Sequence, residues 1–129
     1  MINISIRKPQ PMGIACSDET TALTTGLKMT FRVPYGFTVT GVRANLKTAQ
    51  SAGSLFTVDI QNNGVSILST LVTIDNTEKT SVTAVTPAVI SGPNLADDIE
   101  LTTIITQIGN STATGLKIWI IGFSQMEFL

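Results

Sequence analysis

The 129-residue chain contains no histidine and a single cysteine, and these absences narrow the chemistry it can perform. Without histidine, Ser-His and Cys-His catalytic arrangements are excluded, as are zinc sites that use histidine. Cys16 alone can form neither an internal disulfide nor a cysteine-based metal site. With no base to activate it, Cys16 is interpreted as a small buried residue. We therefore expect no enzyme, no metal and no cofactor.

Charge is also scarce, at 13% of residues against about 25% in typical soluble domains. The only adjacent bases, Arg7 and Lys8, are too few for a nucleic-acid-binding patch. The longest uninterrupted apolar run, residues 118–121, is far too short to span a bilayer, and residues 1–11 lack the apolar core of a signal peptide. We expect a product of a reducing compartment that binds neither nucleic acid nor membrane. Its positive mean hydropathy favours burial of apolar surface between subunits.

Residues 31–46, FRVPYGFTVTGVRANL, carry the clearest structural pattern. They predict a strand, a tight corner at Pro34-Tyr35-Gly36 in which Gly36 has a positive φ, and a second strand. Apolar residues of the second strand change parity at Gly41. This change predicts a β-bulge that keeps both halves of the strand on the core face.

Many short apolar segments separated by turn signals follow this region. Asn62-Asn63-Gly64 is the strongest hairpin signal, because Asn and Gly adopt the left-handed conformation that primed turns need. Further strands are predicted at residues 56–61, 65–67, 71–74, 88–90, 99–108 and 116–122, and a short edge strand at residues 2–6. With no convincing helix, the pattern predicts an all-β protein with a single β-sandwich of jelly-roll type.

We divide the chain into an N-terminal arm or edge strand (residues 1–26), a jelly-roll β-sandwich (27–122) and a short apolar tail (123–129). The arm suits either a flexible terminus with one edge strand or a segment that adds a strand to a neighbouring subunit. The strand at 116–121 is apolar on both faces, so its outer face must be covered by the chain's own loops, by the arm or tail, or by another subunit. The predicted interface residues are Ile2, Ile4, Ile6, Trp119, Ile121, Phe123, Met126, Phe128 and Leu129.

Several polar features are interpreted as structural. The acidic residues between 97 and 100 could bind a cation such as calcium or act as an acid/base pair, but aspartate is common in turns and we assign them to a turn. Residues 110–112 match a glycosylation sequon, which is interpreted as accidental without a secretory signal. Trp119 and Tyr35 could stack on sugars, but aromatic residues make up only 5% of the chain, and Trp119 is assigned to the core or an interface.

Five ordered blocks of strand and turn residues carry a family resemblance. They are PYGFTVTGVRANLKTA (34–49), LFTVDIQNNGVSILST (55–70), TIDNTEKTS (73–81), TPAVISGPNLADDIELTTIITQIG (86–109) and TGLKIWIIG (114–122). Together they resemble a domain that recurs in structural proteins of tailed bacteriophages and prophages, including capsid decoration and fibre or tail proteins. Residues 103–106, TIIT, depart from the acidic pattern of this family, and the apolar tail extends beyond it. Both departures argue against a cation site and for an additional contact.

The resemblance implies a bacteriophage capsid decoration (cement) protein that binds the outer capsid surface and stabilises contacts between major capsid protein subunits. The expected partner is the major capsid protein of the same virion, and the expected assembly is a homodimer or homotrimer. Such a protein is made in the host cytoplasm and located on the virion surface. The alternative is a tail-fibre or head-fibre module that binds a glycan receptor, although no shaft region is visible in this sequence.

Overall fold

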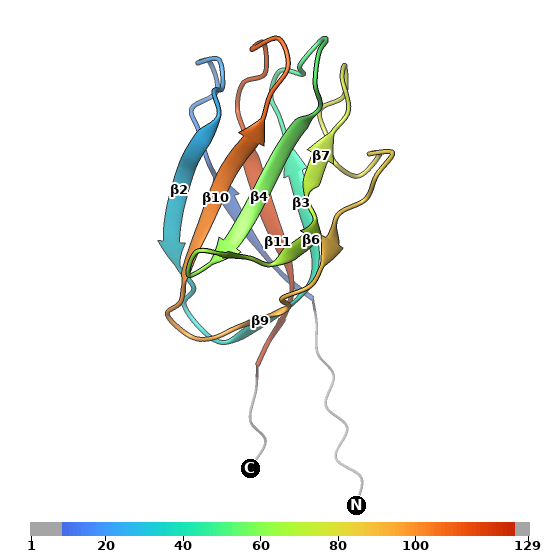
Figure 1. Cartoon of the computed structure of the whole chain (residues 1–129). Helices are drawn as coiled ribbons and strands as arrows, with labels where there is room; N and C mark the ends of the chain where they lie inside the picture. Colours follow the sequence, from blue (N-terminus) through green and yellow to red (C-terminus); the bar gives the residue numbers. More distant parts are fainter. Residues whose placement is uncertain (1–8, 126–129) are drawn as a thin grey trace, which may run out of the picture.

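All regular structure in the described part of the chain is β-strand. The computed structural model describes residues 9–125, in which every strand pairing is antiparallel (Figure 1). The strands are β1 (Gln10–Ala15), β2 (Gly26–Arg32), β3 (Phe37–Asn45), β4 (Phe56–Asn62), β5 (Val65–Ser66), β6 (Leu68–Thr70), β7 (Val72–Ile74), β8 (Val89–Ile90), β9 (Asn94–Leu95), β10 (Glu100–Gln107) and β11 (Lys117–Ser124). The prediction of an all-β protein is confirmed.

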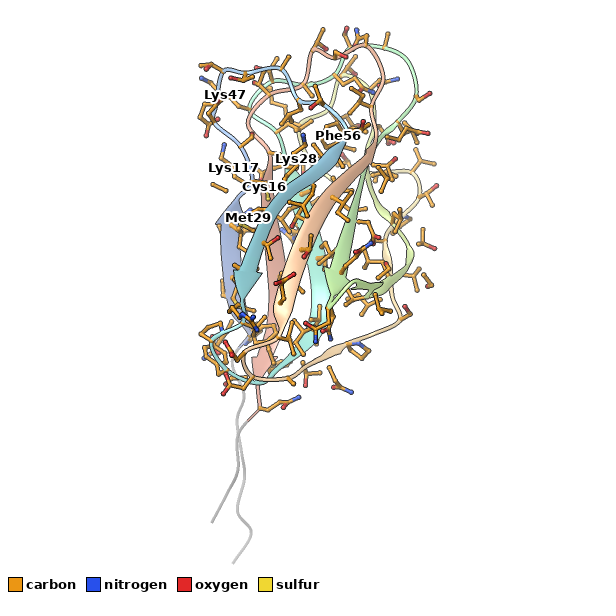
Figure 2. The ribbon with its side chains drawn as sticks, turned by 60° about the vertical axis from the view of Figure 1, so that its left-hand side comes forward. Cys16, Lys28, Met29, Lys47, Phe56 and Lys117 are labelled. Atoms are coloured by element: carbon orange, nitrogen blue, oxygen red, sulfur yellow. The ribbon has the colours of Figure 1, made fainter. Side chains whose placement is uncertain are left out.

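The longer strands form two sheets that enclose one apolar core. The β11 sheet has the order β1-β11-β3-β9, and the β10 sheet has the order β2-β10-β4-β5, with β7 also pairing with β4. β6 and β8 pair with each other in a small third sheet. Fully buried apolar side chains come from both large sheets and include Phe37, Phe56, Ile60, Ile74, Leu101, Ile105, Ile118 and Ile120. Phe56 and Cys16, two members of this core, are labelled in Figure 2.

The parity change in β3 is produced by a β-bulge, as predicted. Ile121 of β11 pairs with Gly41, and the next residue, Gly122, pairs with Val39, so Thr40 is the extra residue. Phe37 and Val39 before the bulge are buried, and the inward positions resume after it. The bulge therefore keeps the whole inner side of β3 on the core.

The corner between β2 and β3 joins the two sheets, because β2 pairs with β10 whereas β3 pairs with β11. Pro34 and Tyr35 form the predicted bend. The prediction of a positive φ at Gly36 is wrong. Glycine is instead favoured here because Gln125 packs closely against it. A Cβ on residue 36 would lie 2.5 Å from Oε1 of Gln125. The backbone N–H of Gln125 donates to the Gly36 carbonyl at 2.8 Å.

The N-terminal region contributes a full strand to the β11 sheet. β1 contains Pro11, although proline lacks the backbone N–H that strand pairing normally uses. The Cys16 N–H donates to the carbonyl of Leu116, the residue before β11, so the backbone N–H groups of the even-numbered β1 residues point toward β11. The backbone nitrogen of Pro11 points to the free edge of the sheet, where a missing donor costs nothing. Deleting residues 1–11 would therefore remove the first two residues of β1. At the other end, β11 includes Phe123 and Ser124, which we had assigned to the tail.

The hairpin between β4 and β5 has the predicted turn. Asn62 pairs with Val65, and the two residues between them both have positive φ values, 48° at Asn63 and 86° at Gly64. These angles are those of a primed two-residue turn. Asn63 also fixes the hairpin to β10, because its N–H donates to the Glu100 carbonyl at 2.9 Å and its side-chain oxygen accepts from the Glu100 N–H at 3.1 Å.

Gly64→Val is expected to lower the free energy of unfolding by about 1–2 kcal/mol, because a β-branched residue is strained at positive φ. Steric contact does not contribute, since a Cβ at position 64 would meet nothing within 4 Å. The measurement is urea unfolding followed by circular dichroism. Gly64→Asn is the control and should cost less, because asparagine tolerates this conformation. Equal stability of the Val variant and the parent would contradict the turn assignment.

Candidate functional site

The outer face of the β11 sheet carries the predicted interface residues that lie in the described part of the chain. Because strand side chains alternate, β11 directs Ile118 and Ile120 into the core and Trp119, Ile121 and Phe123 outward. We call these three outward residues the β11 stripe. Trp119 keeps 40% of its surface exposed, and Ile121 and Phe123 are half-buried. The chain's own described loops therefore do not cover this face.

The Trp119 indole contacts both strands that flank β11. Its Nε1–H donates to Oδ1 of Asn45 on β3 at 2.9 Å. Its six-membered ring lies over Gly13 on β1, where a Cβ would be 2.6 Å from Cζ3 of the indole. The register accounts for this placement, because Trp119 pairs with Gly13 on one side and with Arg43 on the other. One face of the ring remains open to a partner.

The neighbours of the β11 stripe are small around Ile121, whereas the exposed Arg43 of β3 lies beside Trp119. Ile121 pairs with Pro11 on β1 and with Gly41 on β3. Pro11, Gly13 and Ala15 are the outward residues of β1, and all three are exposed. A partner can thus approach the apolar side chains of β11 from the β1 side past small residues, and Arg43 adds a positive charge on the β3 side. Exposed apolar surface of this kind marks interaction sites.

An ion pair lies at one end of this face. Asp18 accepts hydrogen bonds from the Thr21 N–H at 2.7 Å, the Thr21 hydroxyl at 2.7 Å and the Thr20 N–H at 2.9 Å. These bonds lower the pKa of the Asp18 carboxyl and order the turn after β1. The turn places Glu19 against the Lys117 ammonium on β11. Both acidic residues thus have structural contacts at the turn after β1.

Six predicted interface residues lie outside the described residues. They are Ile2, Ile4, Ile6, Met126, Phe128 and Leu129. Their assignment to an interface stays a prediction. Of the nine predicted residues, the structure brings together the three of the β11 stripe.

Asp97 and Asp98 lie in the predicted turn, and Glu100 is the first residue of β10. Asp98 has a φ of 62°, and its carbonyl accepts a hydrogen bond from Arg32 Nη1 at 2.9 Å. The carboxylate of Asp98 lies 3.9 Å from the same guanidinium. Residues 9–125 contain no group of three or more Cys, Asp or Glu side chains placed to hold a metal ion.

Cys16 is buried, as predicted, with 6% of its surface exposed. Burial raises the pKa of its thiol, because the charged thiolate is poorly solvated in the core. A raised pKa keeps the sulfur in the unreactive thiol form at neutral pH.

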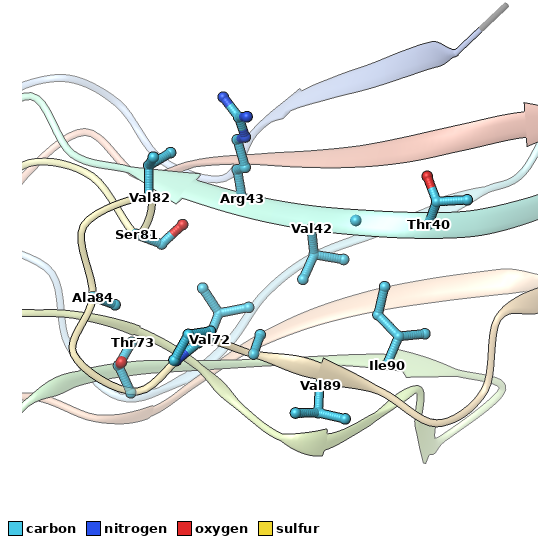
Figure 3. A pocket seen from close by; sticks show the side chains of 13 residues that line it. Thr40, Val42, Arg43, Val72, Thr73, Ser81, Val82, Ala84, Val89 and Ile90 are labelled. Atoms are coloured by element: carbon cyan, nitrogen blue, oxygen red, sulfur yellow. The ribbon is translucent and has the colours of Figure 1, made fainter.

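A second feature, which the sequence did not indicate, is a groove of about 510 Å³ beside β3. We call it the edge groove. Figure 3 shows Val42 pointing from β3 into it, toward Val72 and Ile90, whereas the side chain of Arg43 points away. Its walls come from β3, β7, β8 and the residues before β8. No local pattern could reveal it, because these stretches meet only in the folded chain.

Comparison with known proteins gives no match: no family model fits the chain, and no curated protein or solved structure is detectably similar. In the range 9–125 there is no helix with the length and apolarity needed to cross a membrane. Function must therefore be argued from the two surfaces described above.

Proposed function

We propose that this protein is a capsid decoration (cement) protein of a tailed bacteriophage. It binds the outer surface of the capsid and stabilises contacts between major capsid protein subunits. The β11 stripe is the observation that carries the proposal, because it places one exposed and two half-buried large apolar side chains in a row on the outer face of a sheet. Such a surface suits stable binding to a protein partner and offers no pocket for chemistry. The family resemblance of the five sequence blocks supports the same assignment.

The strand order supports a jelly-roll β-sandwich as the scaffold. With β5, β6 and β8 set aside, the sheets have the orders β1-β11-β3-β9 and β2-β10-β4-β7. Successive strands cross from one sheet to the other, except for β4 and β7, which are neighbours in one sheet. This order is that of two interlocked Greek keys, the arrangement of jelly rolls. Jelly rolls occur in viral capsid domains and also in lectins, so the scaffold alone does not specify the partner.

Burial of the β11 stripe against a capsid subunit would give useful affinity. Each large apolar side chain contributes roughly 1.5–3 kcal/mol when fully buried, before ordering costs. Trp119 should dominate, because tryptophan residues that pack at the centre of an interface are frequent hot spots. Its ring is already held by Asn45, so little conformational entropy is lost on binding.

Trp119→Ala is expected to weaken binding to undecorated capsids by roughly 30-fold, which corresponds to a hot-spot loss of about 2 kcal/mol. The measurement is a titration of purified capsids with the full chain, and circular dichroism checks the fold. Leu27→Ala is the matched control, since Leu27 is also an exposed apolar residue but lies on the β10 sheet. Decorated capsids should also withstand higher temperature than undecorated ones. Unchanged capsid binding by a folded Trp119 variant would remove the main support for the proposal.

The second candidate is a fibre module that binds a glycan receptor. The flat, half-exposed ring of Trp119 favours it, because such rings stack on the apolar faces of sugars. Binding to immobilised glycans, together with a copy number in virions far below that of the major capsid protein, would support this candidate. A copy number comparable to that of the major capsid protein would support decoration.

A further inference from the structure

The outer face of the β11 sheet carries one charge that no described residue compensates. Among the outward side chains of β1, β11 and β3, only Lys117 and Arg43 are charged. Lys117 forms an ion pair with Glu19. The other ion pair within residues 9–125 joins Arg32 to Asp98, so no carboxylate of that range is paired with Arg43. Arg43 is exposed, and its guanidinium is left to the solvent.

Arg43 lies directly beside the main apolar residue of the β11 stripe. Arg43 and Trp119 are opposite each other in the pairing of β3 with β11, and the Cβ atoms of such a pair are about 4.5–5.5 Å apart. Figure 3 shows that the Arg43 side chain leaves β3 on the side away from the edge groove. A stable protein interface buries about 800 Å² on each partner, which is equivalent to a disc about 16 Å in radius. A partner centred on Trp119 therefore also covers Arg43.

Covering Arg43 without pairing it would oppose the affinity that the β11 stripe provides. A charge that loses its hydration is costly unless it is paired and hydrogen-bonded. A guanidinium has several N–H donors and no acceptor, so only acceptor groups of the partner can satisfy it. A carboxylate is the best match, because it accepts parallel N–H bonds from the guanidinium and also neutralises its charge.

We infer that the partner surface that packs on Trp119 presents an aspartate or glutamate carboxylate to Arg43. The inference rests on the proposed function and specifies its docking surface: an apolar patch of the major capsid protein that contains a carboxylate. An apolar surface without this carboxylate would leave Arg43 buried and unpaired. Arg43 thus selects among the apolar surfaces that Trp119 alone would accept.

The first test measures the rates at which the full Arg43→Gln chain binds to undecorated capsids and dissociates from them. Dissociation should become roughly 10- to 100-fold faster with little change in association, because loss of one partner of a buried charge pair acts mainly on dissociation. Lys28→Gln is the matched control. It removes the same charge, but Lys28 lies on β2 in the β10 sheet, so this variant should bind as the parent does. Circular dichroism checks the fold of both variants.

The second test detects the carboxylate itself. The full Arg43→Lys chain is bound to capsids and treated with a water-soluble carbodiimide, which couples an amine to a carboxylate in contact with it. The expected product joins this chain to the major capsid protein, and peptide mass mapping should place the bond between residue 43 and an aspartate or glutamate. The parent chain, with its native lysines, gives the background.

The outcomes separate this inference from the proposed function. If Arg43→Gln dissociates at the parental rate while Trp119→Ala loses binding, the carboxylate is absent and the decoration function stands. An effect of Arg43→Gln confined to the association rate would also overturn the inference, because it would place Arg43 at the rim of the interface. So would an Arg43→Lys chain that binds capsids but forms no bond at residue 43. Failure of the parent chain to bind capsids would overturn the proposed function, and the inference with it.

Discussion

Gly122→Ala is expected to destabilise the protein by about 4 kcal/mol or more, an exceptional loss for one added methyl group. Gly122 is buried on the inner side of β11, at the bulge where it pairs with Val39. A Cβ there would overlap the Thr38 carbonyl oxygen and lie 2.9 Å from the ring of Phe37. Neither neighbour can move, since Thr38 pairs with β9 and Phe37 is fully buried.

Thermal unfolding followed by circular dichroism measures this effect, and the midpoint should fall by roughly 15 °C. Gly41→Ala is the matched control, because Gly41 lies in the same bulge but its Cβ would meet only the Ile121 side chain at 3.9 Å. That variant should remain within about 1 kcal/mol of the parent. Similar losses for both glycines would mean that the bulge requires glycine flexibility, and the steric account would be wrong.

Gln50→Leu is expected to cost about 2–4 kcal/mol, because two partly buried backbone groups lose their partners at about 1–3 kcal/mol each. Gln50 is 1% exposed, and its side chain forms hydrogen bonds with three loops. Its Nε2 donates to the Ser54 carbonyl at 2.6 Å and to Asn76 Oδ1 at 2.7 Å, and its Oε1 accepts from the Gly109 N–H at 2.6 Å. Leucine has a similar size but can replace none of these bonds.

Hydrogen exchange at the Gly109 amide gives a local measurement, and urea unfolding gives the global one. Exchange at Gly109 should accelerate in the Gln50 variant, while amides in the centre of β10 should change only with global stability. Gln107→Leu is the control. Gln107 also donates to a loop carbonyl, that of Leu55 at 2.9 Å, but it is exposed. The Gln107→Leu substitution should lower the free energy of unfolding by less than about 0.5 kcal/mol.

The strands and turns with strong local signals were predictable from the sequence. The alternation at Phe56, Val58 and Ile60 placed β4 correctly, and the parity change at Gly41 located the bulge. Both depend on side-chain alternation, which is visible in a single segment. The sequence pattern did not predict β1, because proline is unfavourable in a paired strand. Pro11 is tolerated in β1 only because this strand lies at a sheet edge.

The surfaces were predictable only in part. Trp119 and Ile121 were assigned to an interface from the two-faced pattern of their strand. That Gly13 lies under the indole follows from the register of β1 against β11, and no short-range signal encodes this register. The edge groove and the role of Gln50 likewise depend on loops distant in the sequence. Such contacts are set by topology, which the sequence pattern leaves open.

The strand order has a consequence for how the chain is made. β11 lies between β1 and β3, and β10 lies between β2 and β4, so one inner strand of each sheet is synthesised after all its partners in that sheet. Until residues 100–124 emerge, four earlier strands lack their central partners and expose unpaired edges and apolar faces. Pairing across such long sequence separations is slow and exposes the nascent chain to aggregation. We therefore expect neither sheet to form completely before β10 and β11 have been synthesised.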